Sequence, residues 1–204
     1  MRRSICRVVL AGALLAGGAS VSAAQETGTP IFKAPYRAFE NHEFGASISD
    51  AEGIDFALEG FYRYGRGSND FSARAGFADV EGGGDAAFLI GGDFRTSVVS
   101  YSESFPLDGA LTIGVGGIFG EGDDRFLIPV GVSLGRRFDL EGSNTTFVPY
   151  AHPVIVPSFG GDDEDVDFAL GLGVDIRFSE SLAIRASGGL GDIEGVGISL
   201  AYIR

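Results

Sequence analysis

The feature that most constrains this chain is a two-residue alternation of side chains, repeated in runs of about ten residues. In residues 166–178, one parity carries Val, Phe, Leu and Ile, and the other carries Asp, Ala, Gly and Arg. Successive side chains of a β-strand point to opposite faces, so each run predicts a two-faced strand. No helical period competes with this pattern.

Ten such runs follow one another, with a turn after each. They cover residues 43–50, 54–64, 70–79, 86–99, 107–119, 125–138, 146–157, 166–178, 181–190 and 194–203. Strands this regular and this closely spaced predict an all-β fold, closed as an antiparallel up-and-down β-barrel. Ten strands are expected, and eight is the alternative if the first run and one other lie outside the barrel.

Composition indicates which face of these strands points outward. A soluble barrel would keep its apolar face inside and cover its outside with charge, yet the only lysine in the chain is Lys33. The other face is mostly Gly, Ala and Ser with isolated charges, which suits a narrow lumen. Aromatic residues also fall near the two ends of the runs, as in the girdles of membrane barrels. The apolar face is therefore expected to contact lipid.

The N-terminus has the pattern of an export signal. Arg2, Arg3 and Arg7 precede a short apolar stretch, and small residues follow up to Ala24. We expect cleavage after Ala23 or Ala24; an uncleaved anchor is the alternative. The predicted division is 1–24 signal peptide, 25–42 irregular periplasmic lead-in, and 43–204 transmembrane barrel.

Acidic residues concentrate in alternate loops, and the formal charge is −13. This balance argues against nucleic acid as a partner, because phosphate binding needs a basic surface. Every second connection is acidic, so negative charge is expected at one mouth, the external one. The run Asp162, Asp163, Glu164 and Asp165 is a weak candidate for divalent cations, since it lacks the ligand spacing of a calcium loop. No cofactor is predicted.

The runs from 43 to 204 resemble the small outer-membrane barrels of Gram-negative bacteria. The end of the chain carries the most specific likeness: Gly197, Leu200 and Tyr202 resemble the C-terminal signal that the barrel-assembly machinery reads, although the chain ends in Ile203-Arg204. The resemblance implies an outer-membrane location. It also implies contact with outer-membrane lipid and lipopolysaccharide, the assembly machinery and periplasmic chaperones. It leaves the oligomeric state open.

Charged residues on the small face are expected inside the lumen. They are Asp55, Glu59, Arg63, Arg74, Asp93, Arg95, Asp167, Asp175, Arg177 and Arg185. Paired, these charges would form a salt-bridged plug that keeps the barrel shut. Unpaired, they would line a path for small solutes, and the glycine-rich wall argues for some free volume.

The run at 146–157 is unusual because Pro149, Pro153 and Pro157 share one parity. Three backbone donors are then missing toward one neighbouring strand. A bulged, twisted strand is one interpretation, and a weakened seam giving lateral access to a lipid is the other. Catalysis is not expected: His42 and His152 are the only imidazoles, His42 precedes the first strand, and His152 has no neighbouring serine. The predicted function is a non-catalytic structural or narrow-pore barrel; the alternative is a lipid-binding or lipid A-modifying barrel.

Overall fold

The computed structural model describes residues 25–37, 39–80, 86–120, 124–160 and 164–204. A short 3-10 turn, η1 (Gln25–Thr27), precedes the strands. The strands are β1 (His42–Ala51), β2 (Ile54–Arg66), β3 (Asn69–Val80), β4 (Ala87–Val99), β5 (Asp108–Phe119), β6 (Arg125–Leu127), β7 (Val130–Gly135), β8 (Phe138–Asp139), β9 (Thr146–Phe159), β10 (Asp165–Arg177), β11 (Leu182–Gly191) and β12 (Gly195–Ile203). Within the described part of the chain, no helix is long and apolar enough to cross a membrane.

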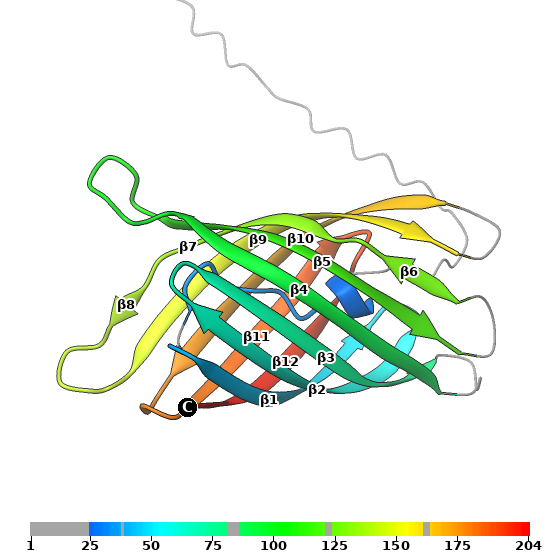
Figure 1. Cartoon of the computed structure of the whole chain (residues 1–204), viewed down its shortest axis with the longest axis horizontal. Helices are drawn as coiled ribbons and strands as arrows, with labels where there is room; N and C mark the ends of the chain where they lie inside the picture. Colours follow the sequence, from blue (N-terminus) through cyan, green and yellow to red (C-terminus); the bar gives the residue numbers. More distant parts are fainter. Residues whose placement is uncertain (1–24, 38, 81–85, 121–123, 161–163) are drawn as a thin grey trace, which may run out of the picture.

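The sheet closes on itself as an antiparallel barrel (Figure 1). β1 pairs with β12 from Glu43 opposite Ile203 to Ala51 opposite Gly195. The short strands β6, β7 and β8 together occupy one position between β5 and β9. The barrel therefore has ten strand positions, which confirms the ten-strand prediction. Both ends of the strand path, β1 and β12, meet without leaving an open edge.

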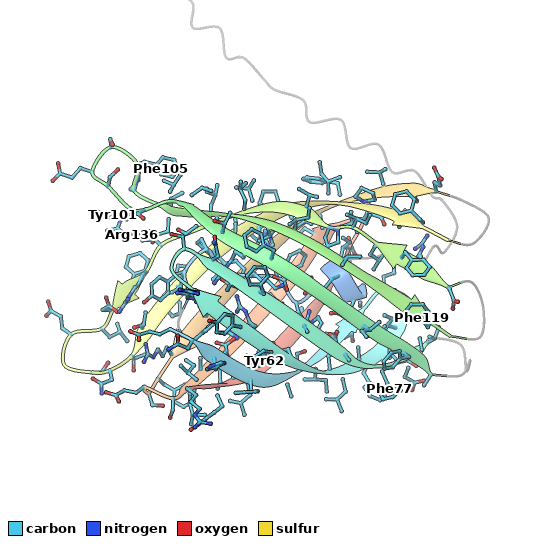
Figure 2. All side chains as sticks on the ribbon, in the orientation of Figure 1. Tyr62, Phe77, Tyr101, Phe105, Phe119 and Arg136 are labelled. Carbon is cyan, nitrogen blue, oxygen red and sulfur yellow. The ribbon has the colours of Figure 1, made fainter. Side chains whose placement is uncertain are left out.

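The two faces of the strands have the arrangement that the composition predicted. The outer surface is built from Phe, Leu, Ile and Val side chains along every strand position, and the buried side chains of the strands are mostly small or charged. Aromatic side chains lie at both ends of this surface, with Tyr101 and Phe105 at one end and Phe77 and Phe119 at the other (Figure 2). Such a belt between two aromatic zones matches a bilayer with two interfaces.

One strand departs from simple alternation. The register of β2 shifts between Ile54 and Phe56, so Ile54 is 4% exposed while Phe56 is 47% exposed. Asp55 is exposed at this point instead of facing the lumen. The prediction for Asp55 was wrong because a β-bulge shifts the parity of every residue before it.

The segment before β1 lies inside the barrel. Its residues 26–35 are buried, and Figure 1 shows η1 and the chain after it enclosed by the strands. We call residues 25–37 the plug. The sequence predicted an irregular periplasmic lead-in at 25–42; the segment is irregular after η1, but the plug is in the lumen and not in the periplasm. Its polar groups find partners on the lumen wall, which makes this burial possible.

Candidate functional site

The candidate site is the lumen, where the plug and the glycine-rich wall fit closely together. A Cβ atom added at Gly116 would overlap the backbone oxygen of Glu26, and one at Gly171 would overlap the ring of Phe32. Similar overlaps with the plug occur at Gly91 and Gly197, and Gly114 and Gly189 approach it less closely. The absence of side chains at these positions lets the wall approach the plug backbone and rings. The free volume that the sequence suggested is filled by the chain itself.

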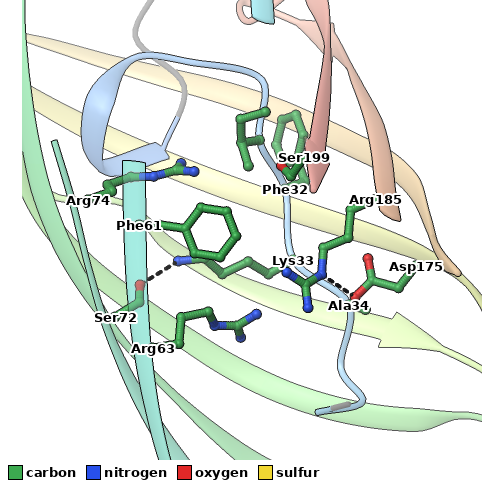
Figure 3. Close-up of a pocket in the computed structure, with 11 residues that line it drawn as sticks. Phe32, Lys33, Ala34, Phe61, Arg63, Ser72, Arg74, Asp175, Arg185 and Ser199 are labelled. Atoms are coloured by element: carbon green, nitrogen blue, oxygen red, sulfur yellow. Dashed lines mark hydrogen bonds and ion pairs between the residues drawn. The ribbon is translucent and has the colours of Figure 1, made fainter. Parts of the chain in front are cut away.

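A first group of charges joins the plug to the wall. Lys33 Nζ lies 2.9 Å from Glu26 Oε1 within the plug and also pairs with Asp93 of β4. Figure 3 shows Lys33 reaching past Phe61 toward Ser72. Thr29 of the plug donates a hydrogen bond of 2.8 Å to Glu59, which lies 3.6 Å from Arg74. All of these charged side chains are buried, so each one depends on its partner.

A second group of charges lies on the wall between β1, β2, β3, β4, β10 and β11. Arg185 contacts Glu43 with both terminal nitrogens, at 2.9 and 2.5 Å, and Asp175 with Nε at 2.9 Å. Arg63 links Glu43, at 3.4 Å, to Asp70, at 3.0 Å. Asp70 also pairs with Arg95 at 2.7 Å, and Arg95 donates to the carbonyl of Ala34 in the plug. The network thus connects the wall to the plug.

The plug backbone is held by side chains of the opposite wall. Tyr150 donates to the carbonyl of Phe32 at 2.9 Å, and Ser187 donates to the carbonyl of Pro30 at 2.7 Å. The amide of Lys33 donates to His152 Nδ1 at 3.3 Å, while His152 Nε2 lies 2.8 Å from the Thr112 hydroxyl. A buried irregular segment needs such partners, because its backbone N–H and C=O groups are not paired within a helix or a sheet.

The cavities found beside the plug among the described residues are small. One cavity of about 30 Å³ lies between the plug and residues Phe61, Arg63, Arg74 and Arg185 (Figure 3). A second, of about 10 Å³, lies beside Lys33, Pro129 and His152. Cavities of this size hold about one or two water molecules.

The structure places most of the predicted lumen charges as the alternation suggested. Glu59, Arg63, Arg74, Asp93, Arg95, Asp167, Asp175 and Arg185 are buried. Arg177 instead lies at the rim, where it donates to the carbonyls of Ser179, at 3.1 Å, and Glu180, at 3.0 Å. Arg177 is the last residue of β10, so its side chain bonds the following turn.

Four charged residues of the network were missed by the sequence analysis. Glu43 shares the parity of Ser47 on β1, and Asp70 shares the parity of Arg74 on β3, so strict alternation could have identified both. Glu26 and Lys33 lie outside the strands and have no such period. The position of Lys33, the only lysine, within an otherwise apolar stretch was the remaining signal.

The three prolines of β9 face one seam. The carbonyls of Pro149 and Pro157 accept hydrogen bonds from Arg136, at 3.2 Å, and Ile128, at 2.9 Å, on the β6–β7 side. The seam with β7 has four paired positions and the seam with β6 has two, whereas β9 and β10 pair at 13 positions. The prolines, which lack a backbone N–H group, therefore face the position in the barrel that is divided among β6, β7 and β8.

The remaining candidates lie on β12 and at or just before the start of β10. Gly197 faces Ile31 of the plug, while Leu200 and Tyr202 are exposed on the outer face of β12. Of the acidic run, Asp162 and Asp163 lie outside the described residues, and Glu164 and Asp165 are exposed. Among the residues that the structure describes, no group of three potential metal ligands comes together.

The plug leaves the barrel at the rim that holds the turn between β8 and β9. Tyr36 accepts a hydrogen bond from Arg137, whose guanidinium also lies over the Tyr36 ring at 4.7 Å. Arg137 and Thr146 donate hydrogen bonds to Asp139 and hold the pKa of that carboxyl below its usual value. Arg137 thus fixes the exit of the plug with one hydrogen bond and one cation–π contact to Tyr36.

Comparison with solved structures agrees with this architecture. The β-domain of the Bordetella autotransporter BrkA matches with a TM-score of 0.51 at 12% identity, over 80% of this chain and 98% of that one. The chain has the fold of a transmembrane β-barrel. A de novo designed transmembrane β-barrel also matches, with a TM-score of 0.41 and 15% identity, over 80% of this chain and 95% of the design. No family description matches the chain, and no curated protein matches its sequence.

Proposed function

We propose that this barrel resides in the outer membrane as a structural or surface protein, with its lumen kept shut by the plug. The observation that supports the proposal most directly is the set of buried ion pairs between Lys33 of the plug and the acids around it. A solute would have to displace these pairs, because the two cavities found beside them among the described residues hold only about one or two water molecules. The predicted export signal and the apolar belt support the location.

Conductance in planar bilayers tests this closed state. The intact mature protein is expected to give no stable current steps. Lys33→Glu places a negative charge beside Glu26 and Asp93, which repels the plug and is expected to produce openings. Lys33→Arg keeps the charge and is the matched control, expected to stay silent. Stable steps from the intact protein, or silence from Lys33→Glu in a folded barrel, would contradict the proposal.

A second candidate function is lipid binding through the seam between β9 and the β6–β7 position. The seam has fewer paired positions than its neighbour, and Val130, Val132 and Ile155 are exposed on its outer side. Hydrogen exchange of the barrel in lipid is the test. Faster exchange in β6 and β7 than in β10 is expected for a seam that opens; uniform protection of these strands would exclude lateral access.

We also propose that the barrel is not an enzyme. The imidazole of His152 is buried between the plug and Thr112, and its contacts support a structural role. Mass spectrometry of lipid A from cells with and without the protein is expected to give identical species. Lipopolysaccharide, the assembly machinery and periplasmic chaperones stay proposed partners, inferred from the outer-membrane location.

A further inference from the structure

Two consecutive arginines between β7 and β8 have opposite surroundings. Arg137 has an acidic partner, since its Nε donates to Asp139 at 2.8 Å. Arg136 shares the parity of Val130 and Val132, whose side chains are exposed on the outer surface of the barrel. The Arg136 side chain therefore belongs to the lipid-facing side, and the Arg137 side chain belongs to the rim of the lumen.

Two aromatic rings hold the guanidinium of Arg136. Its Cζ lies 4.8 Å from the ring centre of Tyr101, in the loop after β4, and 5.1 Å from that of Phe138. Figure 2 shows Arg136 and Tyr101 together at the end of the barrel that carries this loop. Contacts of this kind fix the plane of a guanidinium while leaving its N–H edges available for hydrogen bonds.

No carboxylate of the described residues forms an ion pair with Arg136, whereas the buried arginines Arg63, Arg74, Arg95 and Arg185 each have one. Tyr101 is 50% exposed and Phe138 is 43% exposed, so the guanidinium lies within the aromatic zone where the bilayer headgroups begin. A guanidinium at this depth that has no ion pair with the described carboxylates is open to an anion from the lipid. The anion that a bilayer supplies there is the phosphate of a lipid headgroup.

We propose that Arg136, Tyr101 and Phe138 form a site for the headgroup phosphate of an anionic phospholipid. The guanidinium binds two phosphate oxygens through its free N–H edge, and the two rings contact the glycerol and upper acyl chain. An anionic headgroup is favoured over a zwitterionic one because it carries no ammonium to compete with Arg136. The site depends on the transmembrane fold and does not depend on the plug being closed.

Fluorescence quenching by brominated lipids tests this site. The chain contains no Trp, so Tyr101→Trp introduces a single tryptophan, which can be excited apart from the remaining tyrosines and keeps an aromatic face against Arg136. The variant is placed in vesicles that mix phosphatidylcholine with phosphatidylglycerol, with bromine on one lipid at a time. We expect phosphatidylglycerol to be preferred about fivefold at this position, in line with one basic residue near a membrane surface.

The comparison variants are Arg136→Gln and Arg66→Gln in the same Tyr101→Trp background. Arg66 is an exposed arginine at the end of β2, and no aromatic contact of its guanidinium is found among the described residues. Arg136→Gln is expected to remove the preference, and Arg66→Gln to retain it. Equal loss in both variants would reduce the effect to general surface charge and overturn the proposal.

Soluble anions distinguish a lipid site from a site for free phosphate. Inorganic phosphate, added at the concentration of the lipid, is expected to leave the quenching ratio unchanged. Abolition of the preference by inorganic phosphate would overturn the assignment to lipid. Far-ultraviolet circular dichroism of each variant in the same vesicles confirms that the barrel is folded.

Discussion

At the scale of single residues, the lumen network depends on carboxylates shared between arginines. Glu43 contacts Arg63 and Arg185 and is fully buried, although it is only the second residue of β1. The alternation could locate such residues, because parity is a local property of the strand. Which arginine meets which carboxylate depends on the register of distant strands, and a single sequence does not contain that information.

Glu43→Gln is predicted to destabilise the barrel by about 3 kcal/mol, because it leaves two buried guanidiniums short of one negative charge. Urea unfolding of the protein in lipid vesicles measures this change. Glu40→Gln, at an exposed position before β1, is the control and is expected to change stability by less than about 0.5 kcal/mol. Equal stability of Glu43→Gln and the native chain would mean that the network contributes little.

At the scale of elements, the sequence predicted the strands well and misplaced the plug. The ten runs match the ten strand positions closely because each strand has a lipid face and a lumen face, and this environment imposes the two-residue period. The plug has no repeated environment and therefore no period. The bulge in β2 was also missed. The residue types of Ile54 and Asp55 continue the alternation of the run, and only the pairing of β2 with β3 shows the shift.

The fit between plug and wall can be tested at one glycine. Gly116→Val introduces a side chain where the backbone of Glu26 lies, so we expect it to displace η1 and open the lumen in bilayer recordings. The pore is predicted to prefer cations, because the buried wall of the described strands has more acids, Glu43, Glu59, Asp70, Asp93, Asp167 and Asp175, than bases, Arg63, Arg74, Arg95 and Arg185.

Gly60→Ala is the matched control for this experiment. Gly60 is exposed on the outer face, and the nearest atom to an added Cβ is 4.0 Å away. The added methyl group contacts lipid, and the variant is expected to behave as the native protein does. A closed Gly116→Val barrel would show that the plug can shift without leaving the lumen.

At the scale of the whole molecule, the two ends of the barrel differ in chemistry. The described connections near Glu52 and Glu194 are acidic, whereas the opposite end carries Arg136 and Arg137 and the turn around Ser143. From the sequence, the acidic end is predicted to face the cell exterior. In the structure, the start of β1 at His42 and the end of β12 at Ile203 lie together at the opposite end of the barrel.

Orientation can be measured with a thiol label, because the only cysteine of the chain, Cys6, lies in the predicted signal peptide. Glu52→Cys is expected to react with a membrane-impermeant maleimide on intact cells. Ser143→Cys, in the turn after β8, is expected to react only after the outer membrane has been permeabilised. The reverse pattern would invert the proposed topology.

The enclosed plug also restricts how the barrel can assemble. The plug leads directly into β1, and the seam between β1 and β12 joins the first strand to the last. We therefore expect the ring to be completed around a segment that is synthesised before any of its strands. Assembly is then a wrapping process, in which the final pairing of β12 traps the earlier chain. A bulky tag attached just before residue 25 is therefore expected to hinder this wrapping.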